Sequence, residues 1–270
     1  MAGPLGHPQN WLETMGDTLK SIHKLGLVCS LGCGLVACGG GGGGDGGNPV
    51  SPPVGPTTYT QAAPVAGTSD VFSTAEVDDS NNAISGSYVQ TVASVNPDGS
   101  YTLTQVDPSN DSPIVNGIDY HFNSATLNFD GKGHETGASF TAADGAVQTC
   151  TFTLESGGHP YPWSVGQSFA LTVQESCNPG SSQLLTESGS VASLESVTVP
   201  AGTFMALKLQ TTESWTDSNG QNIVEQITHW ADPSHSLFTI KTVIAYTRSG
   251  NVPAHYVNSQ TIELQSRSSN

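Results

Sequence analysis

The sequence predicts an all-β domain at residues 59–270, folded as an antiparallel meander. Two observations lead to this class. From about residue 58 onward, polar and apolar side chains alternate with period two, and turn sequences separate the alternating runs. No stretch of this part shows a helical period of adequate length. We expect a curved half-barrel, or two similar β lobes at residues 59–155 and 156–270.

Ahead of this domain, residues 1–37 are predicted to be a secretory signal peptide. Leu25–Ala37 is an apolar run that ends in small side chains. A membrane-spanning helix needs about 20 apolar residues, whereas a signal centre of about 7–15 fits this run. Glu13 and Asp17 balance the two lysines of the leader, but a leader that begins at Met15 is net basic, so we expect the true start at Met15.

The apolar run ends in Leu35-Val36-Ala37-Cys38, which resembles the lipobox of bacterial lipoproteins, here of the proteobacterial outer-membrane type. The resemblance implies a diacylglyceryl group on the Cys38 sulfur, cleavage before Cys38, and acylation of the new amino group, for example with palmitate. Gly39 stands where an inner-membrane retention signal has Asp, which implies the outer membrane, on its periplasmic face or at the cell surface. The alternative is a buried N-terminal helix with a free cysteine.

Residues 38–58 are predicted to be a disordered tether. Gly39–Gly47 is a flexible glycine-rich coil, and Pro49–Pro56 is a stiffer polyproline-like spacer. A coil of about 21 residues spans roughly 25 Å on average. The β-domain would therefore hang free of the bilayer.

The chain carries 7 Lys and Arg against 23 Asp and Glu, a net charge of −16. The leader holds two residues of each sign, so the part that follows keeps this net charge. An acidic surface repels phosphate groups, which argues against nucleic acid and against anionic headgroups as partners. We therefore expect the lipid on Cys38 to be the membrane contact.

Two cysteines remain after Cys38, and we expect them to be paired. Cys150 and Cys177 form an even set in an exported chain, and the midpoint between them falls in a loop at Trp163-Ser164, as a hairpin pairing requires. A disulfide that closes a loop of about 28 residues stabilises by roughly 3.5 kcal/mol. The alternative is two buried thiols.

The strands are expected in chain order, joined by short turns. Asn96-Pro97-Asp98-Gly99 has the composition of a hairpin turn, in which Pro presets φ and Gly accepts a positive φ. The expected strands are Val71–Val77, Ser87–Val95, Ser100–Val106, Ile118–Phe122, Ala125–Phe129, Ala138–Thr141, Ala146–Leu154, Ser168–Gln174, Ser190–Val199, Thr203–Thr212, Asn222–Trp230, Ser236–Thr247 and Ala254–Leu264.

The two halves of the domain contain similar segments. Val92–Leu103 and Leu194–Leu207 both read strand, Pro-containing turn, Gly, aromatic residue, strand, at an offset of about 100 residues. Ala66-Gly67 and Val165-Gly166 precede them in corresponding places. Either the halves are an internal repeat, or hairpins of this type merely look alike.

A second resemblance covers about Val191–Ile240. Ser196–Phe204, followed by a strand that ends in Trp230-Ala231-Asp232-Pro233, is similar to a segment of uncharacterised envelope lipoproteins. Those proteins continue with a glycine-rich turn, where this chain has Ser234-His235-Ser236. The resemblance implies a curved antiparallel sheet like the open half-barrels of lipoprotein-sorting proteins, and it transfers no catalytic residue.

Polar clusters offer weak alternatives for chemistry. His229, Asp232 and His235 have metal-ligand types, but spacings of three place strand side chains on opposite faces, so we assign no metal or other cofactor. Asp217–Asn222 resembles the start of a calcium loop without its final acid and is expected to be a hairpin turn.

No catalytic residue is assigned. The part after Cys38 has no G-x-S-x-G elbow for a nucleophilic serine. A glycosidase would need two converging carboxylates, but acids on a meander are expected on its wet face. The acids considered are Glu187, Glu195, Glu213 and Glu225.

Three aromatic residues, Tyr161, Trp163 and Trp215, lie at or beside predicted loops. They are predicted either to face a ligand in a cavity mouth or to fill the open end of the sheet. Together these observations favour a lipid-anchored, non-catalytic binding or scaffold module, with a hydrophobic ligand or an envelope protein as partner. The alternatives are a surface interaction or adhesion protein and a hydrolase with an unrecognised site.

Overall fold

The computed structural model describes residues 57–107, 114–115, 118–119, 123–142, 145–178, 180, 182–217, 219–252 and 256–268. The predicted signal peptide, Cys38 and the tether up to residue 56 lie outside the described residues. Within the described part, no helix has the length and apolar character needed to cross a membrane.

The described residues form β-strands connected by turns. The strands are β1 (Thr58–Tyr59), β2 (Ser69–Asp78), β3 (Ala83–Val95), β4 (Tyr101–Val106), β5 (Ile114–Val115), β6 (Ile118–Asp119), β7 (Ser124–Phe129), β8 (Glu135–Thr141), β9 (Val147–Gly158), β10 (Trp163–Ser164), β11 (Ser168–Asn178), β12 (Ser182–Val199), β13 (Gly202–Thr216), β14 (Gln221–Ala231), β15 (Thr239–Gly250) and β16 (Val257–Arg267).

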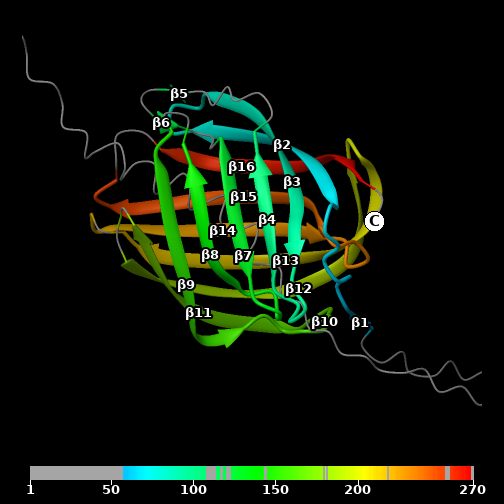
Figure 1. Ribbon diagram of the computed structural model, residues 1–270. Coiled ribbons are helices and arrows are strands. Elements are labelled where there is room, and N and C mark those ends of the chain that lie inside the picture. The colour runs from blue at the N-terminus through cyan, green and yellow to red at the C-terminus, as the bar shows by residue number, and fades with distance from the viewer. Residues whose placement is uncertain are drawn as a thin grey trace, which may run out of the picture.

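Twelve of these strands close into one antiparallel barrel, in the order β11-β12-β13-β14-β15-β16-β2-β3-β4-β7-β8-β9. Figure 1 shows β4, β7, β8 and β9 on one wall, crossing β13 to β16 on the opposite wall at a steep angle. The predicted all-β antiparallel class is confirmed. The half-barrel is a coarser description than this closed barrel, and the two halves are not separate lobes, because β9 pairs with β11 and β16 pairs with β2.

Alternation along each strand builds the core. On β4, Tyr101, Leu103 and Gln105 are buried while the residues between them are partly exposed. Because successive strand side chains point to opposite faces, one set from every strand enters the barrel. The main apolar cluster draws on β3, β4, β7, β8, β9 and β10 to β16, and a second cluster includes Phe72 of β2, so every strand of the barrel contributes to a buried core.

The two halves of the barrel repeat the same arrangement of six strands, β2-β3-β4-β7-β8-β9 and β11-β12-β13-β14-β15-β16. The Gly67 amide donates to the Val92 carbonyl at 2.8 Å, and the Gly166 amide donates to the Val191 carbonyl at 2.8 Å. A β-bulge follows each of these valines. Both positions are shifted by 99 residues (67 to 166, 92 to 191), so these entry turns and bulges occupy equivalent places in the two halves.

The halves differ most at the β12–β13 hairpin, which is much longer than its counterpart β3–β4. Its tip contributes Val199 and Ala206 to a second apolar cluster, where they pack with Phe72, Ile262 and Leu264. The Ala201 amide also donates to the Leu264 carbonyl at 3.1 Å. The tip thereby ties the second half of the chain to the strands at the β16–β2 closure.

Cys150 of β9 and Cys177 of β11 are directly opposite each other in the ladder and are joined by a disulfide in the structure. The bond lies on one of the two seams where the halves meet. It therefore fixes the register of the β9–β11 closure.

Replacing both cysteines (Cys150→Ala with Cys177→Ala) should lower the free energy of unfolding by about 3.5 kcal/mol. The disulfide joins residues 27 positions apart, and its removal restores that loop's entropy to the unfolded chain. Urea unfolding measures the change. As a control, Thr151→Ala with Ser176→Ala alters the adjacent pair of the same ladder and should cost less than about 1 kcal/mol. Equal urea midpoints for the cysteine variant and the wild type would contradict this expectation.

A β-bulge bends β9 where it pairs with β11. Thr172 is opposite Ser156 while Val173 is opposite Leu154, so Glu155 is the extra residue. Gly157 follows with φ 76°, and a Cβ there would overlap the backbone at the Ala170 carbonyl. The bend therefore depends on a glycine at this position.

Gly157→Ala should destabilise far more than Gly145→Ala. Both glycines have positive φ, which costs alanine about 1–2 kcal/mol, but only Gly157 has backbone in the way of a Cβ. Thermal unfolding of both variants is the measurement. Similar melting temperatures would contradict this expectation and show that the β11 backbone can move away from the added Cβ without a loss of stability.

Candidate functional site

Many of the chain's acidic side chains lie inside the protein. The buried acids are Asp70, Glu76, Asp78, Asp107, Glu135, Glu175, Glu187, Glu213, Asp217 and Glu225. The sequence led us to expect an acidic surface from the net charge of −16. The structure instead places many of these acids in the interior. Burial of ionised carboxylates is expensive unless they are hydrogen-bonded, paired or protonated, which makes this group the first candidate site.

Three of these glutamates form a row across neighbouring strands. Glu187 of β12 is opposite Glu213 of β13, which is opposite Glu225 of β14. Their exposed fractions are 5%, 1% and 0%. The row faces the barrel interior, because Leu185 and Ile227, two residues away on the same strand faces, belong to the main core.

The expectation that acids on this meander mark its wet face is wrong for Glu187, Glu213 and Glu225. Of the four acids considered, Glu195 alone has a solvent-accessible carboxylate. The sequence did carry a usable signal. Glu225 lies between Ile223 and Ile227 in the period-two pattern, as a residue on the apolar face must.

A histidine closes one end of the row. The His159 Nε2 atom lies 3.6 Å from a Glu187 carboxylate oxygen, and the imidazole packs against the rings of Trp163 and Phe169. Burial lowers the pKa of His159 to about 4, and His134 adds to this effect. The imidazole is therefore neutral at pH 7 and does not form an ion pair with Glu187.

Glu135, at the start of β8, is a buried carboxyl group without hydrogen bonds from the described residues. It is 4% exposed, and neither of its oxygens has a hydrogen-bond partner among the described residues. Burial raises the pKa of Glu135 well above its ordinary value, and repulsion from Glu175 and Glu213 raises it further. The folded protein therefore favours the protonated, neutral acid.

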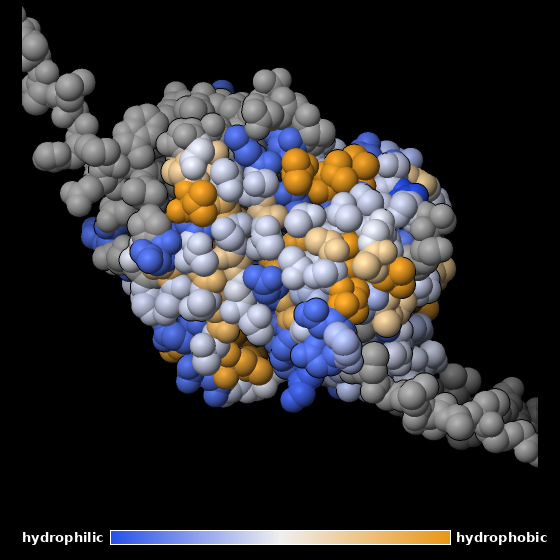
Figure 2. Space-filling view, in the orientation of Figure 1, coloured by the Kyte–Doolittle hydropathy of each residue, from blue (hydrophilic) through white to orange (hydrophobic). Residues whose placement is uncertain are grey.

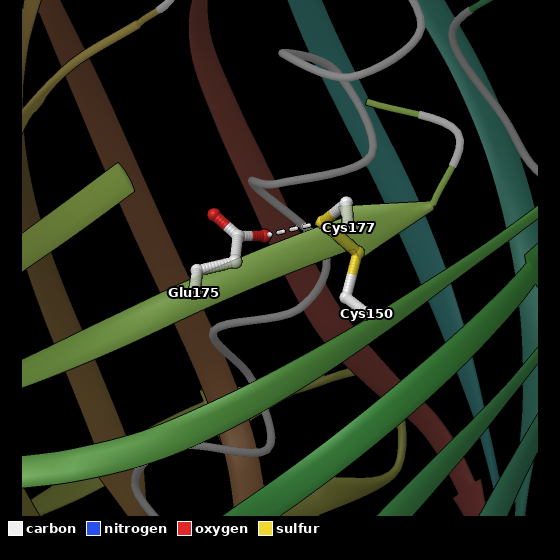
Figure 3. Close-up of side chains that lie close together, drawn as sticks. All are labelled: Cys150, Glu175 and Cys177. Atoms are coloured by element: carbon white, nitrogen blue, oxygen red, sulfur yellow. Dashed lines mark hydrogen bonds between the residues drawn. A yellow bond between two sulfur atoms is a disulfide. The ribbon is translucent and has the colours of Figure 1, made fainter. Parts of the chain in front are cut away.

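Glu175 lies against the disulfide, as Figure 3 shows. One carboxylate oxygen is 3.3 Å from the Cys177 sulfur, and the other accepts a hydrogen bond from the Gln183 amide. Among the described residues, Cys150, Glu175 and Cys177 are the one group of potential ligands close enough to share a metal ion. Because both sulfurs are bonded to each other, no thiolate is available for a metal.

The glutamate row resembles a catalytic pair in spacing but not in access. Opposite residues on neighbouring strands have Cβ atoms about 4.5–5.5 Å apart, and retaining glycosidases hold two carboxyl groups about 5–5.5 Å apart. A catalytic acid must also come within hydrogen-bond reach of a substrate. Glu213 and Glu225 are buried at 1% and 0% exposure, so the row does not present these acids to a substrate.

The sequence set His229, Asp232 and His235 does not converge. The His229 Nδ1 atom lies 2.8 Å from the Thr242 hydroxyl inside the core, and burial lowers the pKa of His229 to about 3. Asp232 accepts a hydrogen bond of 2.8 Å from Arg267. The His235 Nδ1 atom accepts a hydrogen bond of 3.2 Å from the Leu237 backbone amide, so each of the three residues has a separate structural role. Asp217 caps a hairpin turn, where its carboxylate accepts the backbone amides of residues 219 and 221.

The three predicted aromatics lie in or against the core. Trp163 is 5% exposed and lines a small cavity together with Leu209. Trp215 is also 5% exposed but lies six residues beyond Leu209 on β13, roughly 20 Å away. The Tyr161 hydroxyl accepts a hydrogen bond from the Gln61 amide. These side chains therefore do not line one common cavity.

Part of the outer surface of the barrel is uncharged, in contrast to the acidic interior. Outward-facing positions in residues 102–106, 124–128, 137–141, 147–153, 168–176, 182–190 and 210–216 carry no charged side chain and are mostly Ser and Thr. We call this surface the neutral wall. In Figure 2 its front part, over β4, β7 and β8, is largely pale, the colour of intermediate hydropathy.

Comparisons with known proteins give little to build on. No protein-family model matches the chain, and no curated protein matches it in sequence. A candidate lipoprotein from Parabacteroides distasonis has a TM-score of 0.42 and 13% identity, covering 78% of this chain and 99% of its own. A candidate exported protein with a YmcC-like fold from Bacteroides fragilis has a TM-score of 0.40 and 10% identity, covering 79% and 100%. We infer nothing about function from similarity at this level.

Glu135→Gln should stabilise the protein at neutral pH and leave it nearly unchanged in acid. The raised pKa of Glu135 means that the folded state keeps a proton that the unfolded state loses. Wild-type stability should therefore fall as pH rises above the ordinary pKa of 4.5, and Gln removes that loss. Urea unfolding at pH 4.5, 6.0 and 7.5 measures the difference.

Glu195→Gln is the control of opposite sign. A hydrogen bond from Trp230 lowers the pKa of Glu195, and a second, weaker effect comes from the hydrogen bond of Ser193. The contribution of ionised Glu195 to the stability of the fold is therefore present at neutral pH and disappears in acid. This variant should lose stability at pH 7.5 and approach the wild type at low pH. Parallel stability curves for the wild type and Glu135→Gln would rule out the assigned role of Glu135.

Proposed function

We propose that the chain is a lipid-anchored lipoprotein of the outer membrane and that its barrel is a non-catalytic binding module. The proposed location rests on one observation: an apolar run ends in Leu35-Val36-Ala37-Cys38, and a glycine tract follows directly. The lipid on Cys38 is the membrane contact, and residues 38–58 hold the barrel away from the bilayer.

Two features support a module that binds through its outside. Buried apolar side chains from most strands point into the described barrel interior, and the cavity beside Trp163 has room for about one water molecule. A hydrophobic ligand of useful size therefore finds no space at that point. The neutral wall, in contrast, is an extended surface on which a partner meets no fixed charge.

Cys38→Ser should release the protein from the membrane fraction into the soluble fraction, since it removes the only sulfur to which the lipobox directs lipid. Fractionation after cell lysis, together with the mass of the N-terminal peptide, provides the measurement. Cys33→Ser is the matched control, because this cysteine leaves with the signal and its loss should change nothing. A Cys38→Ser protein that still sediments with membranes would overturn the proposed anchor.

A further inference from the structure

The neutral wall contains a groove on the outside of β9, β11, β12 and β13, with a volume of about 310 Å³. It lies beside the β-bulge of β9, where the extra residue bends the strand away from its partner. Six hydroxyl-bearing side chains line the groove: Ser156, Thr172, Thr186, Ser188, Thr212 and Ser214.

These hydroxyls are arranged by the ladder in two rows. Thr172 is opposite Thr186, which is opposite Ser214, and Ser188 is opposite Thr212 in the row beside it. Neighbouring strands lie about 4.8 Å apart, so hydroxyl groups recur at this interval across the groove. A ligand that crosses the strands meets a regular series of groups that can each donate and accept a hydrogen bond.

Three of these six hydroxyls are available to a ligand. Thr186 and Ser214 share a hydrogen bond of 2.9 Å. Within the described part of the chain, the hydroxyls of Thr172, Ser188 and Thr212 have no hydrogen-bond partner, and Ser188 and Thr212 are exposed. Their bonding capacity is therefore directed to solvent or to whatever occupies the groove.

The chemistry of the lining restricts the ligand class. The one ionisable residue in the lining is Glu187, whose carboxylate points inward with a side-chain exposure of 4%, and the exposed Glu155 precedes Ser156 just outside the lining. A cationic ligand finds no exposed carboxylate in the lining, and an anionic ligand finds no cation and meets a chain of net charge −16. The apolar surface of the lining comes from Ala170, from the small exposed part of Leu171 and from the carbon atoms of the Ser and Thr side chains, so no large apolar side chain faces a ligand.

From these observations we infer that the groove binds an uncharged polyhydroxylated ligand, namely a segment of a neutral glycan. This inference rests on the proposed function as a binding module and names its ligand class. Sugar hydroxyls both donate and accept hydrogen bonds, as Ser and Thr hydroxyls do. The volume is at the lower end of ligand sites, and no aromatic ring lines the groove, so binding to one chain segment is weak, with a Kd of about 1 mM.

The test is a titration of the soluble Cys38→Ser protein with neutral hexasaccharides: maltohexaose, cellohexaose, mannohexaose and chitohexaose. Chemical-shift changes of backbone amides report binding and its place. At least one of the four should bind and shift amides of β11 to β13, while the hexamer of galacturonic acid should not bind. The absence of binding by all four at about 10 mM, or equal binding of the anionic hexamer, overturns the inference.

Thr172→Val with Thr212→Val removes two groove hydroxyls while keeping β-branched shapes suited to strands, and it should weaken binding at least tenfold. Thr104→Val with Thr126→Val changes a directly opposed pair elsewhere on the neutral wall and should leave affinity unchanged. Unchanged affinity of the groove variant overturns the site. If the double variant does not fold, Thr172→Val alone provides the same comparison. If the glycan titration fails, the proposed lipid anchor at Cys38 is not affected, because membrane fractionation of the Cys38→Ser protein tests the anchor separately.

Discussion

Closure of the sheet is the constraint on which the rest of this structure depends. Two ladders, β9 with β11 and β16 with β2, join the two six-strand halves of the chain into one ring. A closed ring has no free edge strands and gives every strand an inner and an outer face. The Cys150–Cys177 disulfide secures one closure, and the tip of the long β12–β13 hairpin packs against strands at the other.

The contrast between the two faces follows from this closure. The inner face gathers the apolar core together with Glu135, Glu175, Glu187, Glu213 and Glu225, and the neutral wall presents mainly hydroxyls. Glu135 in these surroundings favours its protonated form, because the charged form loses its water. The chain therefore keeps a large acidic charge in its composition while part of its surface is uncharged.

The repeat of two halves explains both the regularity of the barrel and its local differences. Equivalent entry turns at Gly67 and Gly166 and equivalent bulges set the same register in each half. The halves then diverge in hairpin length, whereas both closing ladders contain a bulge, at Glu155 in β9 and between Leu264 and Ser266 in β16. The second apolar cluster arises at the longer β12–β13 hairpin, and the groove lies beside the bulge of β9.

The sequence by itself determined the antiparallel all-β class, the turns, and which cysteines could pair, because alternation and turn chemistry are local properties of the chain. The Ile223-x-Glu225-x-Ile227 pattern even held the signal for a buried acid. Only the tertiary structure decided that the sheet closes and that Glu187, Glu213 and Glu225 meet inside it. The physical reason is that burial is set by strands distant in sequence, such as β2 and β16, whose pairing no local pattern specifies.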